Sequence, residues 1–167
     1  QSPASWEQQL EAFPSSVAPA LDAGTVEAMA RQAAHQGPAH FVGLSMGGVV
    51  ALELFRQSPT LVRSLTLACT WSKHPQGRER IDFLEESLAK MTLREWAAGS
   101  RPFLLSPGAS EETARQVFEL EAAKDPWLYR RQWKSVFSAD LSSVVPTVPT
   151  LLLGASLTFA LLAFVSV

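Results

Sequence analysis

The chain has 167 residues, 47% of them hydrophobic, and a formal net charge of −2. This length and composition predict one globular domain with a sizeable core, and the balanced charge argues against nucleic-acid binding. The lone cysteine, Cys69, excludes an internal disulfide, and we expect it to be a small buried residue rather than a reactive thiol. No amino-terminal segment has the pattern of a signal peptide, so a cytoplasmic protein is expected.

Two helices are predicted in the first 38 residues. Trp6, Leu10 and Phe13 fall on one face of a helix within residues 5–13. A second helix is predicted from Thr25 to His35, ended by the Gly-Pro pair that follows it. The apolar stripe of this second helix consists of Val26, Met29, Ala30 and Ala33.

Residues 39–48 read Ala-His-Phe-Val-Gly-Leu-Ser-Met-Gly-Gly, a short apolar strand followed by Gly-x-Ser-x-Gly and then an apolar helix. This order predicts a nucleophile elbow, a sharp turn that lifts the hydroxyl of Ser45 above the edge of a sheet. The dipole of the following helix points its positive end toward the oxygen on which negative charge would develop. The pattern therefore predicts Ser45 as a nucleophile and the backbone N–H of Met46 as an oxyanion donor.

Three glycines support the prediction of an elbow. Gly43 and Gly47 lie two residues before and two residues after Ser45. At a tight turn they remove side chains that would collide. Gly48 extends the glycine-rich start of the helix and agrees with the same interpretation.

The chain after the elbow helix changes in character. Residues 65–67 predict a further strand, whereas residues 71–140 hold most of the charge and most of the aromatic residues. Four short helices are predicted within 71–140, with a break from Pro102 to Pro107. The signals for these helices are the face Ile81, Leu84, Leu88 and Met91, the capping box Thr92 with Glu95, and the capping residues Ser110 and Asp125.

The carboxyl-terminal part has no charged residue after Asp140. Residues 149–154 predict a strand and a turn, and residues 155–167 form an apolar tail. Together with the end of the strand, the tail has about the minimum length of a membrane helix, but no Lys or Arg flanks it. A membrane anchor, an apolar segment packed in the fold, and a truncated or misread carboxyl terminus remain open alternatives.

Taken together, these stretches resemble the α/β-hydrolase superfamily, and most of all its branch of 3-oxoadipate enol-lactonases and related esterases. The resemblance rests on residues 39–48, continues through 58–67, and resumes at 149–154. It implies an α/β fold, here an incomplete α/β-hydrolase fold in which a parallel sheet has flanking helices and a helical cap. Residues 17–22 would then correspond to a shortened strand of that family.

The resemblance also implies a division of the chain and an activity. Residues 1–70 and 141–154 would form a partial core, 71–140 the cap over the active site, and 155–167 the tail. The implied activity is hydrolysis of a small carboxylic ester or lactone through an acyl-enzyme on Ser45, with no cofactor and no metal.

The family pattern is incomplete in this sequence. It places an acid within a few positions of Gly154 and a histidine in a later loop, and the sequence has neither. His35 and His40 precede the elbow, so we expect structural or solvent-facing roles for them. His74 lies on the same sheet edge as Ser45, but we do not expect it to be the base. Histidines in surface loops are common, and Asp82 and Asp140 both lie in or beside the predicted cap.

Two functional interpretations follow. In the first, the chain is a serine hydrolase by descent, with its activity reduced by the missing acid and histidine. In the second, it is a non-catalytic, truncated homologue with an apolar tail that could attach it to a membrane.

Overall fold

The computed structural model describes residues 3–105 and 108–154, in which a small parallel sheet is joined to helices. The strands are β1 (Ala39–Leu44), β2 (Val62–Ala68) and β3 (Thr150–Leu153). The helices are η1 (Pro3–Trp6), α1 (Glu7–Ala12), α2 (Val26–Ala34), α3 (Met46–Gln57), η2 (Pro59–Leu61), α4 (Gly77–Lys90), α5 (Leu93–Leu104), α6 (Glu111–Ala122) and α7 (Pro126–Ser138).

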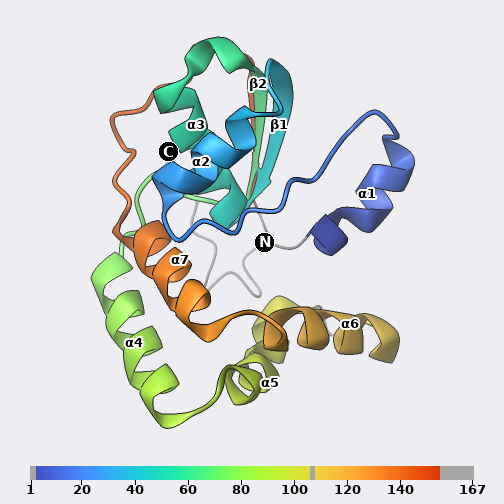
Figure 1. Ribbon diagram of the computed structural model, residues 1–167, viewed down its shortest axis with the longest axis vertical. Coiled ribbons are helices and arrows are strands. Elements are labelled where there is room, and N and C mark those ends of the chain that lie inside the picture. Colours follow the sequence, from blue (N-terminus) through green and yellow to red (C-terminus); the bar gives the residue numbers. More distant parts are fainter. Residues whose placement is uncertain (1–2, 106–107, 155–167) are drawn as a thin grey trace.

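The sheet has the strand order β1-β2-β3, and both pairs are parallel. Helix α3 packs against β1 and β2, and α2 packs against α3 (Figure 1). The main core lies between these elements, and its most deeply buried side chains include Met29, Val49, Leu54 and Leu65. Apolar residues of the elbow helix are therefore held directly against the sheet, which fixes the point at which the helix begins.

Local capping signals define the ends of several helices as the sequence predicted. The hydroxyl of Thr25 accepts a hydrogen bond from the N–H of Ala28 at 3.3 Å. The capping box at α5 is formed in both directions, at 2.7 Å from the Thr92 N–H to Glu95 and 3.2 Å from the Glu95 N–H to Thr92. Side chains of Ser110 and Asp125 accept from backbone N–H groups at the starts of α6 and α7. The predicted caps at Thr92 with Glu95, at Ser110 and at Asp125 are thus confirmed, and the cap at Thr25 is an addition from the structure.

Helices α4 to α7 lie between β2 and β3 in the sequence and beyond the carboxyl ends of the strands in space (Figure 1). They have a small core of their own, which contains Leu84, Leu88, Leu93 and Tyr129. The two ends of this four-helix segment meet, because the N–H of Leu141 donates to the carbonyl of Ser72 at 2.8 Å. The segment therefore leaves the sheet and returns to it at nearly the same place.

Helix α7 attaches the four-helix segment to the main core. Val136 is fully buried in that core, and the Ser135 hydroxyl accepts from the N–H of Val26 at 2.8 Å. The amide of Gln132 donates to the carbonyls of Leu21 and Ala23, each at 2.9 Å. Packing and hydrogen bonds together hold α7 against the start of α2.

Three local predictions are wrong. Residues 17–22 form no strand, because Pro19 removes a ladder donor from the middle of a six-residue segment. Helix α5 continues through Pro102 to Leu104, since a proline in the last turn removes only its own N–H donor and the helix ends two residues later. Met91 is extended and 39% exposed, because α4 ends one residue earlier and the chain turns away from the helix face.

The predicted apolar tail, residues 155–167, lies outside the described residues. Among the helices that the structure describes, none combines the length and the apolarity needed to span a bilayer.

Candidate active site

Ser45 occupies the sharp turn between β1 and α3. Its backbone angles, φ 53° and ψ −120°, lie in a region that side chains rarely adopt, at a cost of about 1–3 kcal/mol. The side chain is half-buried, and within the described part of the chain its hydroxyl makes no hydrogen bond. The predicted turn is confirmed, and it places the Ser45 hydroxyl at the carboxyl edge of the sheet, without a hydrogen-bond partner among the residues that the structure describes.

The glycines allow the strand and the helix to approach each other closely. A Cβ on Gly43 would lie 2.5 Å from the carbonyl oxygen of Gly47 and 2.7 Å from the Cα of Gly48. A Cβ on Gly48 would lie 2.5 Å from side-chain atoms of Thr70. All three distances are far shorter than a normal van der Waals contact. The turn therefore requires glycine at positions 43 and 48, and Gly47 provides the backbone that Gly43 touches.

Met46 is the first residue of α3, and its side chain is buried in the core. An N–H in the first turn of a helix has no carbonyl of its own helix to bind. It also lies at the positive end of the helix dipole. The backbone N–H of Met46 therefore has the chemistry of an oxyanion donor, and its catalytic role stays a prediction.

His35 and His40 lie away from the turn, as the sequence predicted. His35 is the exposed residue at the carboxyl end of α2. The Nδ1 of His40 lies 2.7 Å from the hydroxyl of Ser64 near the start of β1. Ser45 follows His40 by five positions of extended chain, which corresponds to about 16 Å. Neither imidazole is therefore placed to accept a proton from Ser45.

His74 is buried, so the prediction of a surface histidine is wrong. Its ring packs edge-on against Trp71 and Phe137, with centroids 4.9 and 5.1 Å apart. Burial lowers the pKa of this imidazole, and the nearby charge of Arg80 lowers it further. We therefore expect the ring to be neutral at pH 7.

The tautomer of His74 is the wrong one for a serine base. Its Nδ1 accepts the backbone N–H of Gln76 at 3.1 Å. In a neutral imidazole this leaves the proton on Nε2. A base for serine needs a free lone pair on Nε2 and an Nδ1–H that donates to an acid. The hydrogen bond to Gln76 agrees with the prediction that His74 is not the base.

The two acids considered in the sequence, Asp140 and Asp82, are bound to other groups. Asp140 binds Lys73 at 2.7 Å, and that hydrogen bond holds the pKa of the carboxyl down at about 2, with help from Ser142. Asp82 pairs with Arg78 at 3.0 Å. Among the described residues, no three His, Cys, Asp or Glu side chains gather in a way that could hold a metal ion.

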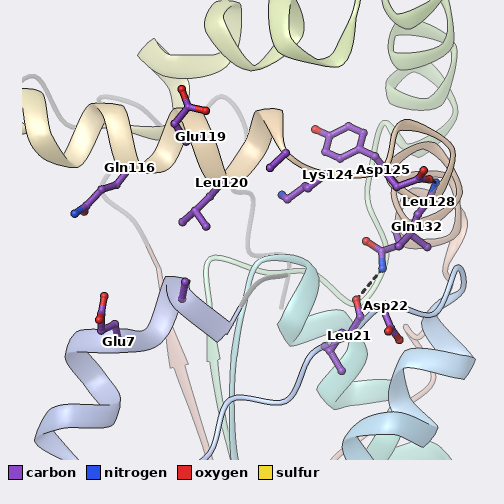
Figure 2. Close-up of a pocket in the computed structure, with 13 residues that line it drawn as sticks. Glu7, Leu21, Asp22, Gln116, Glu119, Leu120, Lys124, Asp125, Leu128 and Gln132 are labelled. Carbon is purple, nitrogen blue, oxygen red and sulfur yellow. Dashed lines mark hydrogen bonds between the residues drawn. The ribbon is translucent and has the colours of Figure 1, made fainter.

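A cavity of about 640 Å³ lies between α1, α6, the start of α7 and the loop before α2 (Figure 2). Figure 2 shows Gln116 and Leu120 of α6 extending toward α1, where Glu7 lies, whereas Glu119 points to the opposite side of α6. Ser45 is not among the residues that line the cavity. Four acidic residues and one basic residue line the cavity, and this excess of negative charge disfavours an anionic ligand. The acidic residues are Glu7, Asp22, Glu119 and Asp125, and the basic residue is Lys124.

Sequence reasoning missed one residue at the turn, Thr70. The hydroxyl of Thr70 donates to the carbonyl of Ser45 at 2.7 Å, and the side chain is only 6% exposed. A threonine after a predicted strand has no local signature of such a contact. The contact arises because β2 lies next to β1, so that the end of β2 meets the turn.

Comparison with known proteins gives a family match over nearly the whole chain. A model described as the alpha/beta hydrolase family matches residues 2–162. Among curated proteins, none matches. The three solved structures described next are each less than 25% identical to this chain, so their likeness shows the fold alone.

Three solved structures illustrate that likeness. A hydrolase from Pseudomonas aeruginosa PA01 is 24% identical, with a TM-score of 0.71 over 90% of this chain and 66% of its own. An esterase from Thermogutta terrifontis is 22% identical, with a TM-score of 0.68 over 83% of this chain and 56% of its own. An enol-lactonase from Burkholderia xenovorans LB400 is 18% identical, with a TM-score of 0.72 over 90% of this chain and 67% of its own. The chain thus spans between about half and two thirds of the length of these structures.

Proposed function

Because this chain belongs to the alpha/beta hydrolase family, we propose that it carries the nucleophilic part of a site that cleaves small carboxylic esters or lactones. Ser45 is the nucleophile, and the backbone N–H of Met46 stabilises the oxyanion. The observation that carries the proposal is the conformation of Ser45, a strained residue with a hydroxyl unpartnered among the described residues, set directly before a helix. Strain of this kind concentrates at functional sites.

In the proposed reaction, the Ser45 oxygen bonds to the acyl carbon while its proton leaves and the carbonyl electron pair moves onto oxygen. The N–H of Met46 binds that oxyanion; one such donor contributes about 2.7–4 kcal/mol in a well-studied serine protease. Collapse of the tetrahedral intermediate expels the alcohol oxygen, which takes up a proton. Water then attacks the acyl-enzyme and releases the acid.

The proton acceptor in this reaction is not one of the three histidines. His35 and His40 are remote, and His74 holds its proton on the wrong nitrogen. With water as the acceptor, the loss of base catalysis lowers turnover on the order of 10⁴- to 10⁶-fold relative to a site with a base. The described residues therefore form a site that acylates slowly.

We assign helices α4 to α7 within residues 71–140 to the cap, and residues 1–70 and 141–154 to the core. Two features support this division. The four helices lie beyond the carboxyl ends of the strands (Figure 1), and their segment leaves and rejoins the sheet between Ser72 and Leu141. Such a cap would bound the substrate site and exclude water from it.

A second candidate function is a scaffold that binds without turnover. The state of His74 favours this candidate, because the ring is buried and its proton lies on Nε2, the nitrogen that would have to accept the serine proton. A serine without a base is a poor nucleophile. The two candidates differ in whether Ser45 forms a covalent bond.

A fluorophosphonate probe distinguishes them. We expect one probe per folded chain, on the peptide that contains Ser45, and none on Ser45→Ala. Ser16→Ala, which removes an exposed hydroxyl, is the matched control and should be labelled like the unsubstituted chain. Labelling should rise continuously with pH, since no histidine acts as the base in the proposed reaction. Equal labelling of folded and urea-unfolded chains, or none on Ser45, would favour the scaffold.

A further inference from the structure

Both backbone polar groups of Ser45 are bound by two residues, one at the end of β2 and one just beyond it. The N–H of Ser45 donates to the carbonyl of Ala68 at 2.9 Å. The carbonyl of Ser45 accepts from the hydroxyl of Thr70 at 2.7 Å. The end of β2 therefore holds the strained residue from both of its peptide groups.

The side chain of Thr70 is itself fixed in position. It is 6% exposed, and its Cβ, Cγ2 and Oγ1 lie 2.5–2.6 Å from the point that a Cβ on Gly48 would occupy. The preceding residue, Cys69, has a φ of 47°, and its N–H donates to the carbonyl of Leu153 at 2.8 Å. Within the described chain, Ser45 and Cys69 are the two non-glycine residues with positive φ. The unusual conformation at Cys69 turns Thr70 onto the elbow.

The carbonyl that Thr70 binds belongs to the same peptide group as the N–H of Met46. A peptide group is planar, so fixing its carbonyl direction also fixes the direction of its N–H. A hydrogen bond accepted by the carbonyl also polarises the group and strengthens the N–H as a donor, by about 10–30%. We infer that Thr70 is a positioning residue, which orients and strengthens the Met46 N–H as the oxyanion donor. This inference rests on the proposed roles of Ser45 and Met46.

The hydrogen bond is not needed simply to satisfy the Ser45 carbonyl. That oxygen already accepts from the N–H of Gly48 at 2.9 Å and lies 3.4 Å from the N–H of Val49. The first turn of α3 is thus closed without Thr70. The hydrogen bond from Thr70 is a third bond to this oxygen, and it comes from the segment that follows β2. It therefore restrains the plane of the peptide group from outside the helix, which neither bond within α3 does.

Two substitutions separate the hydroxyl from the methyl group. Thr70→Val keeps a branched side chain against Gly48 and removes the donor, whereas Thr70→Ser keeps the donor and removes the methyl. Thr66→Val, the same change four residues earlier in β2, is the matched control. The hydroxyl of Thr66 makes no hydrogen bond within the described residues. All variants are made in the full chain.

The first readout is the amide resonance and the hydrogen-exchange rate of Met46, measured by NMR, which requires no activity. We expect both to change in Thr70→Val and to stay near those of the unsubstituted chain in Thr70→Ser and Thr66→Val. The second readout is the rate of fluorophosphonate labelling. It should fall about tenfold in Thr70→Val and remain within about twofold in Thr70→Ser.

The two readouts keep this inference and the proposed function distinguishable. If the unsubstituted chain is not labelled, the proposed function fails, and the Met46 resonance still decides whether Thr70 orients the peptide. An unchanged Met46 amide in Thr70→Val overturns the inference. So does labelling of Thr70→Val at the rate of the unsubstituted chain, or an equal loss of labelling in Thr70→Ser and Thr70→Val.

Discussion

Gly43→Ala is predicted to destabilise the fold by forcing β1 and α3 apart. The added Cβ would lie 2.5 Å from the Gly47 carbonyl oxygen, which is about 1 Å short of ordinary contact. The atoms that it meets are backbone atoms of a helix whose next turns are buried, so no rotamer change can relieve the overlap. Overpacking of this kind costs about 1–3 kcal/mol. For a domain of this size that cost lowers the melting temperature by roughly 2–12 °C.

Thermal unfolding followed by circular dichroism measures this effect. Gly99→Ala is the matched control, because a Cβ there meets nothing within 4 Å and alanine is the better helix former in α5. Its melting temperature should equal or exceed that of the unsubstituted chain. A Gly43→Ala protein that melts within about 1 °C of the unsubstituted chain would refute the close approach of strand and helix.

Two further predictions concern buried polar groups. Burial raises the pKa of Tyr129, the single tyrosine, to about 12. The folded state thus holds this proton more tightly, so the stability contributed by Tyr129 is full below pH 10 and is lost as pH rises toward 12. Tyrosinate absorbance should show a midpoint near 12 when folded, and a midpoint near 10 would contradict the burial. Gln132→Leu removes the hydrogen bonds to Leu21 and Ala23 and should cost about 1–3 kcal/mol in urea unfolding; a change below about 0.5 kcal/mol would show that they contribute little.

The elements that sequence reasoning predicted correctly are those with local signals. The capping box of Thr92 and Glu95 depends on residues three positions apart, so it survives in any tertiary setting. The turn at Ser45 is encoded the same way, since the glycines that permit it lie within a few residues of it. The strand predicted at residues 65–67 is also present, and it extends from Val62 to Ala68.

The features that sequence reasoning missed depend on contacts between distant segments. Thr70 acts on a residue 25 positions earlier, and nothing beside it in the sequence indicates that β1 and β2 are neighbours. The burial of His74 depends on Phe137, which arrives from the far end of the four-helix segment. The strand predicted at residues 17–22 is absent for a local reason. Pro19 lies within this apolar segment and lacks the N–H that would pair with a neighbouring strand.

The most direct test of the central claim is to trap an acyl group on Ser45. The full chain is incubated with p-nitrophenyl acetate, quenched in acid, digested and analysed by mass spectrometry. We predict an acetyl group on the peptide that contains Ser45, absent from Ser45→Ala and from the urea-unfolded chain. An unmodified Ser45, or acetylation spread equally over serines and lysines, would contradict the claim that this turn presents a nucleophile.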